Sequence, residues 1–532
     1  MFFLFPIFTY ILNGTMYVDY KVLIPFIPIL TLFVANMMFN FENNKKIINK
    51  SLVISLLIGI FVFLFNLDNN KKIIFILELL MLILCFMIKI KFKKSKLNNL
   101  FILVIVITVA LFTSFNSDSL YLKDDYNNLT NSDSKGYEEV FNNEESIYRV
   151  ANNNYLLQNI NRILSTDYYS GTIYSSTSNN NYKSFYYNET GNEITQRTYG
   201  KITSSMNIFY NLYNANKFFV SDGSVPVGYN RVSVNDNLYV NEDVLPIIYA
   251  SDNVMGYDKY KELEFPYNME ALLKNIIVKD YSNSNFESSI EDFNGSISIL
   301  ENIDNIKINK INNLYSFDIE NTTNMKFKVD GLNKNDILMI EFSLDNNQKC
   351  SNGDLEITIN EIKNVLSCNG WKYHNKNTTF NYVLSSNDVI NELNVVFSKG
   401  NYVISDLKIY VINYDKLENI KNNVDEFIFD KEKTKGNYIK GNINVTKDGY
   451  LYMSIPYDEG FTIYLNGKKQ NYEKVDGSFI GFKINKGVYS LEIIYNAPFL
   501  KEGKIASIIG TIIFGVIFIS ENRKIKKSIA KK

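Results

Sequence analysis

Apolar residues are concentrated at the two ends of this chain, and a long polar stretch separates them. Five apolar runs occupy residues 1–12, 21–39, 51–67, 73–91 and 100–115, and one further run covers residues 505–519. A helix needs about 20 predominantly apolar residues to cross a bilayer, and the first run is only about half that long. The pattern predicts about five N-terminal spans in residues 1–115 and one C-terminal span in residues 501–521.

The basic residues between these runs predict the orientation of the spans. Lysines cluster in the loop at residues 42–50, in the loop after the fourth run and in the tail at residues 522–532. If all five runs span, these three segments lie on one side, which the excess of lysine and arginine marks as cytoplasmic. Only Lys71 and Lys72 are discordant. The central polar region is therefore expected on the outer side of the membrane.

The central region shows several successive patterns. Residues 116–143 are charged and rich in Asn and Ser, which indicates a flexible linker. Residues 144–300 mix short extended runs with helical spacing, including a helix expected over residues 257–278, and predict an α+β domain. From residue 301 to 425 the apolar residues alternate with a period of two, and turn residues separate the runs. That alternation predicts a β-sandwich.

Residues 426–500 are predicted to form a second small β-sandwich. Asp448-Gly449 and Asn466-Gly467 each separate two strand-like runs, and Asp476-Gly477 and Lys486-Gly487 close two more connections. Asn-Gly and Asp-Gly supply the positive φ angles that tight hairpin turns require. The fold class expected from the whole pattern is a helical transmembrane bundle that carries a large extracytoplasmic α+β and β-sandwich region.

Composition excludes some kinds of site and leaves others open. The net charge of -1 and the lack of a basic cluster away from the membrane flanks argue against nucleic acid as a partner. His374 is the single histidine, so a histidine-based metal site or triad is not expected, and no cofactor is indicated. Cys350 and Cys368 can pair in a disulfide if the central region is extracytoplasmic, although two cysteines without CxxC spacing say little by themselves.

Six polar residues are candidates for substrate binding: Asp19, Glu78, Arg149, Asn161, Ser175 and Ser176. Glu78 lies inside an apolar run, where an ionisable group suggests function, but it also lies near the outer end and can reach the interface. Asp19 belongs to the first outer loop, where an aspartate equally well caps a helix. The other four occupy a segment rich in Tyr, Ser and Asn that suits a sugar or phosphate, although Asn and Tyr are common throughout the chain.

The C-terminal residues resemble a known family. The segment "LYMSIPYDEGFTIYLNGKKQ" and its continuation to Gly510 resemble the C-terminal signature of the YfhO family of bacterial membrane proteins. Matching positions upstream include Asn13-Gly14 and the segment that holds Arg149, Asn161, Ser175 and Ser176, so the resemblance covers nearly the whole chain. The C-terminal positions in register are Pro456, Tyr457, Gly460, Gly467, Lys468, Gly487, Tyr495 and Gly503.

The resemblance implies a GT-C-type glycosyltransferase of the bacterial cell membrane. Such enzymes transfer a sugar from a polyprenyl-phosphate donor to an envelope acceptor, such as teichoic acid, on the outer face. In this class the key acidic residue usually lies in the first outer loop of a larger bundle, and this chain is expected to begin after that point. The alternatives are a membrane-anchored carbohydrate-binding or scaffold protein without catalysis and, less favoured, a transporter or channel.

Overall fold

The computed structural model describes residues 144, 146–153, 169–174, 179–199, 201–232, 237–281, 286–300, 306, 308–345, 350–371 and 373–530, with a few isolated positions before residue 144. The chain divides into two units, Met1–Lys123 and Asp124–Lys532. All the helices and strands named below belong to the second unit. Apart from those isolated positions, the spans expected in residues 1–115 and the linker at 116–143 lie outside the described residues.

The first described region is built on a five-stranded sheet in which β1 is parallel to both of its neighbours. Its strands, in sheet order, are β2 (Tyr169–Ser170), β1 (Arg149–Asn152), β5 (Phe218–Val220), β7 (Leu238–Val240) and β6 (Asn230–Arg231). Helix α9 (Ile208–Tyr213) follows Asn207, whose side chain accepts hydrogen bonds from the N–H groups of Phe209 and Tyr210. Every residue of α9 is buried, so the cap satisfies donors that water does not reach.

Short elements complete this region. They are β3 (Ile173–Tyr174), α8 (Asn180–Ser184), the π-helical turn η4 (Phe185–Glu189), β4 (Lys201–Ile202), β8 (Ile248–Ser251), β9 (Val254–Gly256), α10 (Tyr257–Tyr260), α11 (Tyr267–Lys274) and β10 (Ile276–Val278). The single helix expected over residues 257–278 is wrong. Pro266 separates α10 from α11, and β10 pairs in parallel with β9. The apolar residues of β10 matched helical spacing, but the run is too short for spacing alone to distinguish a buried strand.

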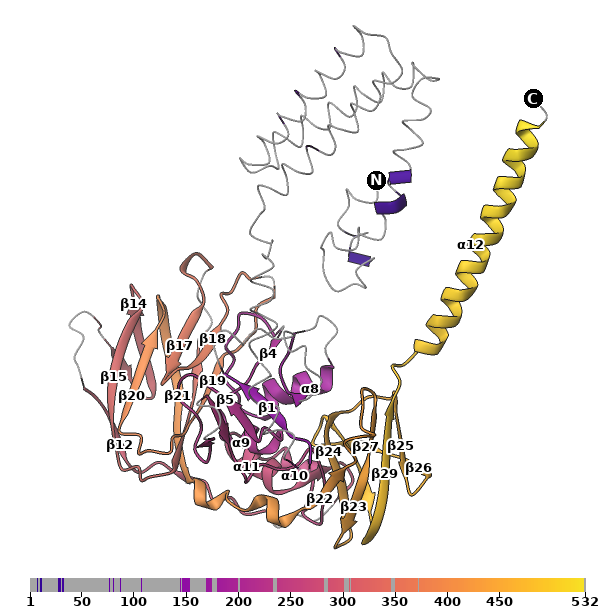
Figure 1. The fold of residues 1–532 in the computed structure, drawn as a ribbon. Helices are drawn as coiled ribbons and strands as arrows, with labels where there is room; N and C mark the ends of the chain where they lie inside the picture. Colours follow the sequence, from indigo (N-terminus) through magenta and orange to yellow (C-terminus); the bar gives the residue numbers. More distant parts are fainter. Residues whose placement is uncertain are drawn as a thin grey trace. The chain divides into compact units, whose positions relative to one another are not determined.

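A β-sandwich follows (Figure 1). One sheet holds β13 (Asn309–Ile311), β14 (Leu314–Ile319), β21 (Gly400–Asn413), β16 (Asp336–Leu344) and β19 (Thr379–Leu384), with β11 (Glu291–Asp292) paired to β21. The other sheet holds β12 (Ser296–Ile299), β15 (Thr323–Asp330), β20 (Glu392–Phe397), β17 (Leu355–Ile359) and β18 (Ile362–Leu366). The rings of Phe317 on β14 and Phe397 on β20 lie 5.3 Å apart, and the Tyr382 hydroxyl on β19 donates to the Ile357 carbonyl on β17. These contacts join the two sheets face to face.

The last sheet has nine strands. In sheet order they are β26 (Lys468–Gln470), β25 (Phe461–Leu465), β29 (Gly487–Tyr495), β23 (Tyr438–Val445), β22 (Asp425–Phe429), β8, β24 (Gly449–Pro456), β28 (Phe479–Ile484) and β27 (Glu473–Val475). Strand β8 belongs to the preceding α/β region in sequence and lies here between β22 and β24. The sequence pattern did not indicate this exchange of a strand. Three short 3-10 turns, η5 (Cys350–Asn352), η6 (Tyr414–Lys416) and η7 (Ile420–Asn423), lie in connections.

Two of the four expected hairpin connections are confirmed. Asn466 and Gly467 have φ angles of 49° and 75° and join β25 to β26. Asp476 and Gly477 have φ angles of 49° and 67° and join β27 to β28. The hairpin at Asp448-Gly449 is wrong, because β22 and β8 separate β23 from β24 in the sheet. A hairpin at Lys486-Gly487 is also wrong, because β28 and β29 are not neighbours in the sheet. A turn dipeptide predicts the conformation of the local backbone, but it does not determine which strands are neighbours in the sheet.

Aromatic side chains join the α/β region to the nine-stranded sheet. The Phe185 ring lies 5.1 Å from the Tyr213 ring and 4.7 Å from the Phe479 ring, and the Tyr452 ring lies 5.6 Å from that of Tyr213. All four residues are buried. Packed aromatic pairs contribute beyond their buried area, so this cluster fixes α9 against β24 and β28.

Helix α12 (Leu500–Ile529) follows β29 and ends the described chain (Figure 1). Within its stretch Leu500–Lys524, an 18-residue window has a mean hydropathy of 2.0 and no buried residues. Among the described residues, α12 is the one helix that is long and apolar enough to cross a membrane. Its apolar surface has no protein cover in the described structure. The expected C-terminal span therefore coincides with a continuous exposed helix.

Candidate functional site

Arg149 is the one predicted substrate-binding residue that the structure describes. Asp19, Glu78, Asn161, Ser175 and Ser176 lie outside the described residues. Arg149 belongs to β1, and its guanidinium donates to the Asn214 carbonyl at 2.9 Å and to both the hydroxyl and the carbonyl of Ser454. These bonds hold the end of β24 in place. Arg149 thus positions the neighbouring backbone. Because its guanidinium already binds protein groups, it can affect a ligand site only by holding that backbone in place.

Tyrosines surround this guanidinium. The hydroxyls of Tyr182 and Tyr210 lie 2.9 Å apart, and the Tyr182 hydroxyl donates to the Gly171 carbonyl at 3.3 Å. Burial raises the pKa of both phenols, and the positive charge of Arg149 lowers it by a smaller amount. Both phenols therefore stay protonated at physiological pH and serve as hydrogen-bonding groups within the fold.

An open groove lies directly beyond this cluster, at the beginning of α12. We call it the α12 groove. Its volume is about 670 Å³, and its lining residues are Asn179, Asn180, Asn181, Ile455, Pro456, Tyr457, Asp458, Glu459, Phe461, Tyr495 and Pro498. Pro498 precedes the first residue of α12, Leu500, by two positions. If α12 spans a membrane, the groove opens within a few residues of the membrane surface.

The amide wall of the α12 groove is fixed by hydrogen bonds. The side chains of Asn179 and Asn181 both donate to the Tyr457 carbonyl, at 3.1 and 3.2 Å. The Asn181 carbonyl accepts from the Ser478 hydroxyl at 2.6 Å, and its side-chain oxygen accepts from Lys474 at 3.3 Å. Asn179 also caps α8 by accepting from two backbone N–H groups. The amides are therefore held in place before any ligand arrives.

Aromatic rings near Asp458 also line the α12 groove. The Phe461 and Tyr495 rings lie 4.7 Å apart, and the Tyr472 hydroxyl, behind the groove, donates to the carbonyls of Asp458 and Phe461. Asp458 Oδ1 accepts from the Gly460 N–H at 2.7 Å. Burial, followed by the charge and hydrogen bond of Asp458, raises the pKa of Tyr495. The Tyr495 hydroxyl is thus a donor that already contacts a carboxylate.

This combination of groups suits a sugar better than a phosphate. Aromatic faces pack against the C–H faces of a sugar ring, and amides and carboxylates pair with hydroxyls. The charged side chains that line the groove are Asp458 and Glu459, and two carboxylates repel an anion. A neutral or cationic hydroxylated ligand therefore fits the electrostatics of the α12 groove.

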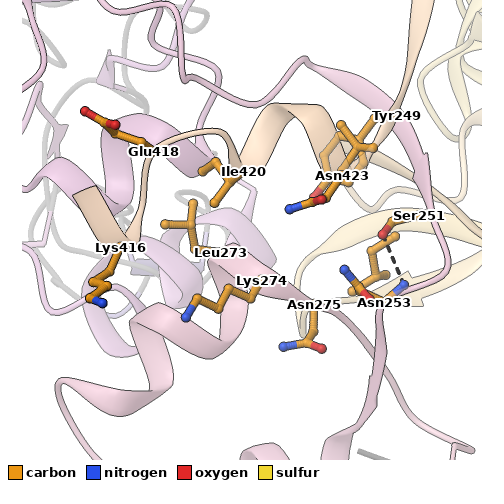
Figure 2. A pocket seen from close by; sticks show the side chains of 12 residues that line it. Tyr249, Ser251, Asn253, Leu273, Lys274, Asn275, Lys416, Glu418, Ile420 and Asn423 are labelled. Atoms are coloured by element: carbon orange, nitrogen blue, oxygen red, sulfur yellow. Dashed lines mark hydrogen bonds between the residues drawn. The ribbon is translucent and has the colours of Figure 1, made fainter. Parts of the chain in front are cut away.

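A second hollow, of about 210 Å³, lies between α11, β8 and η7 (Figure 2). Leu273, Ile276 and Ile420 are buried in it. Its polar residues are Ser251, Asn253, Lys274, Asn275, Lys416, Glu418 and Asn423. Lys274 is already bound to the buried carboxylate of Glu270, and the lining carries both signs of charge. This pocket offers no exposed ring for a sugar and is the weaker candidate.

Buried carboxyl groups elsewhere are structural. Asp476 accepts from the Tyr213 hydroxyl and from the Ile277 N–H, and burial raises its pKa to about 7. Glu193 accepts from the Ser205 hydroxyl and the Met206 N–H, and burial raises its pKa as well. In the part of the chain that the structure describes, no group of three or more His, Cys, Asp or Glu residues could hold a metal ion.

Cys350 and Cys368 form a disulfide with a Cα–Cα distance of 4.9 Å. It joins η5 to the residues after β18. Disulfides persist mainly in oxidising, extracytoplasmic environments, so this bond agrees with a location of the sandwich outside the cytoplasm.

Sequence reasoning did not single out the α12 groove. A signal was present in "PYDEGF" (residues 456–461), where a Pro-Tyr pair, two carboxylates and a Phe occur together. The contribution of residues 179–181 had no such signal, because only the fold brings α8 to β24.

Comparison with known proteins decides the family. The family model described as "Bacterial membrane protein YfhO" matches residues 3–507. The chain belongs to the YfhO family. It is thus a member of a family of bacterial membrane proteins, and α12 is its described candidate span.

The chain is also similar to the uncharacterized protein YfhO of Bacillus subtilis (strain 168). The two are 24% identical over 366 residues, which cover 66% of this chain and 41% of that protein. The chain thus spans about two fifths of the relative's length.

Likeness to solved structures is slight. CpGH89CBM32-6 of Clostridium perfringens is 13% identical, with a TM-score of 0.12 over 23% of this chain and 94% of that chain. Latent PorU of Porphyromonas gingivalis is 12% identical, with a TM-score of 0.15 over 51% of this chain and 27% of that chain. At these TM-scores neither likeness bears on the fold.

Proposed function

We propose that this YfhO-family chain acts in glycosyl transfer at the outer face of the bacterial membrane. In this proposal the donor is a polyprenyl-phosphate-linked sugar and the acceptor is an envelope polymer of the teichoic-acid type. The α12 groove holds the sugar. The single observation that carries the proposal is the position of a groove of rings, amides and carboxylates two residues before a candidate span. A lipid-linked sugar is presented at that height above the bilayer.

Family membership and the disulfide support this placement. The family consists of bacterial membrane proteins, and the Cys350–Cys368 bond suits an oxidising environment. Basic residues follow the apolar part of α12, among them Arg523, Lys524, Lys526 and Lys527, which favours a cytoplasmic C-terminal end. The groove, at the other end of the helix, would then face outward.

In the transfer itself, the acceptor hydroxyl oxygen forms a bond to the anomeric carbon of the sugar. The bond from that carbon to the lipid-phosphate oxygen breaks, and the hydroxyl proton passes to a carboxylate acting as general base. Glu459 is the exposed carboxylate of the groove. Asp19 and Glu78, both outside the described residues, remain proposed contacts to donor or acceptor. Asp458 already accepts hydrogen bonds from Gly460 and Tyr495, so in this proposal it orients the sugar and does not take the proton.

The test is a strain that lacks the gene encoding this chain, complemented with the natural gene or with Tyr495→Ala or Glu459→Gln variants. We expect the deletion to lose one sugar from an envelope polymer and to accumulate the lipid-linked sugar. Tyr495→Ala should reduce the modification about fivefold, because loss of a ring contact costs ~1 kcal/mol. The matched control is Tyr464→Ala on the same sheet, since Tyr464 does not line the groove.

Normal glycan composition in the deletion strain would refute transfer. A second candidate function, carbohydrate binding without catalysis, is favoured by the hydrogen bonds that already occupy Asp458. It predicts that the purified full chain in detergent binds envelope glycan, that Tyr495→Ala weakens binding, and that deletion leaves the glycan composition intact.

A further inference from the structure

A disulfide and two buried asparagines hold the loop between β18 and β19 in place. We call residues 367–371 and 373–378 the Trp371 loop. The disulfide ties Cys368, at the start of the loop, to Cys350. The backbone N–H of Cys368 donates to Asp354 at 3.0 Å, and that of Gly370 to the Cys350 sulfur at 3.3 Å. The loop thus starts from a fixed position.

Two buried asparagines fix the other half of the Trp371 loop. The Asn375 side-chain oxygen accepts from the Ser367 N–H at 3.1 Å, and its amide group donates to the carbonyls of Gln196 and Val365 at 2.9 and 2.7 Å. Asn377 donates to the Val365 carbonyl at 3.2 Å. Asn375 and Asn377 are 0% and 6% exposed. These buried hydrogen bonds hold the described part of the loop in one shape.

That framework presents aromatic side chains to solvent. Trp371 is 37% exposed and Tyr373 is 47% exposed. The Arg197 guanidinium lies 3.7 Å from the centre of the Trp371 ring, and a salt bridge of 3.2 Å to Asp354 fixes it there. Arg197 also donates to the Cys368 sulfur at 3.1 Å. One part of the indole is therefore held against a cation, and the remaining part faces water.

The surroundings of the two rings are polar. Trp371 and Tyr373 are the large hydrophobic residues of the described loop that are exposed. Their exposed or half-exposed neighbours include Asn369, Gly370, Lys376 and Gln196. A protein interface of standard size buries about 800 Å² on each side around an apolar centre. A pair of rings among amides is too small and too polar for that, but it matches one or two sugar rings.

We propose that the Trp371 loop is a binding site for a carbohydrate chain, in which a pyranose ring stacks on the exposed part of Trp371. Hydroxyls of the sugar pair with amide groups beside the ring, such as Asn369. A rigid loop loses little conformational entropy when it binds a ligand. More of the contact energy of the exposed tryptophan therefore contributes to affinity. This site lies on the β-sandwich, is independent of the α12 groove, and does not rest on the transferase proposal.

The chain itself carries the reporter for a test. Trp371 is the one tryptophan in the sequence, so tryptophan emission of the purified full chain in detergent comes from this residue. The probes are hexamers of glucose and of N-acetylglucosamine, which are neutral, and a hexamer of galacturonic acid, which is anionic. We expect a saturable change in emission with at least one hexamer. Comparison of the neutral hexamers with the anionic one shows whether the charge of the sugar affects binding. No saturable change with any of the three would overturn the proposal.

A second measurement separates carbohydrate from protein. Retention of the full chain on isolated bacterial cell walls should fall about fivefold in Trp371→Ala, since one lost ring contact costs ~1 kcal/mol. Tyr315→Ala is the matched control on the same sandwich, and circular dichroism checks that each variant folds. Retention that depends on Trp371 should disappear after periodate oxidation of the wall sugars. If it disappears after protease treatment and survives periodate, the partner is a protein and the proposal fails.

Discussion

At the scale of single residues, burial decides the role of each polar group. Arg149 stood out in the sequence as a possible ligand contact, yet its guanidinium binds Ser454 and the Asn214 carbonyl. Asp476 had significance only as part of a turn dipeptide, yet it is a buried carboxyl between β10 and the β27–β28 hairpin. The spacing of residues in the sequence does not show which distant residues surround a buried polar side chain in place of water.

Asp476 makes stability depend on pH in a definite direction. Burial raises its pKa from 3.8 to about 7, so between these values the folded chain holds a proton that the unfolded chain has released. Stability is therefore greatest at low pH in this window, falls as pH rises through it, and levels off above about 7. From about pH 5 to pH 8 the loss should be roughly 3 kcal/mol, since one pKa unit corresponds to ~1.4 kcal/mol.

Asp476→Asn tests this effect. The amide cannot ionise, but its oxygen can still accept from the Ile277 N–H. Denaturant unfolding of the full chain in detergent, followed by circular dichroism near pH 5 and pH 8, should show that most of the difference in unfolding free energy has gone. The control is Asp388→Asn at an exposed position. An unchanged difference in Asp476→Asn would show that another group titrates.

At the scale of elements, alternation and turn residues predicted strands well, but they did not predict which strands pair. The burial of β17 alternates residue by residue, as expected for a sandwich strand. In contrast, β23 and β24 looked like a hairpin, and β22 and β8 separate them. Pairing across such separations depends on contacts that have no local sequence pattern.

Gly441 on β23 tests how closely these strands approach. A Cβ atom there would lie 2.1 Å from the Ile428 carbonyl oxygen on β22, and backbone cannot move aside as a side-chain end can. We expect Gly441→Ala to lower the unfolding free energy by about 1–3 kcal/mol, as overpacking does. Denaturant unfolding measures it.

Asn442→Ala, at the exposed neighbouring position, is the control for Gly441→Ala and should change stability by less than ~0.5 kcal/mol. Equal effects of the two variants would mean that β22 and β23 can separate at low cost.

At the scale of the whole molecule, α12 sets where the described region lies relative to a membrane. The proposed orientation predicts that Asn496, before α12, is outside the cell and that Asn522, near its end, is inside. In single-cysteine variants at these positions, a membrane-impermeant maleimide should label Asn496→Cys in intact cells. Asn522→Cys should be labelled only after permeabilisation. The reverse pattern would place the α12 groove in the cytoplasm and contradict the proposed function.

The sequence by itself determined the properties that depend on local pattern. The apolar run at the C-terminus, the alternating strands of the sandwich, the two Asn-Gly and Asp-Gly hairpins and the resemblance to a membrane-protein family were all readable, because each depends on neighbouring residues. Only the tertiary structure decided what Arg149 binds, that β8 joins a distant sheet, and that residues 179–181 line one groove with Tyr457 and Tyr495. These facts depend on which distant surfaces bury one another, and that choice is made by the packing of the whole chain.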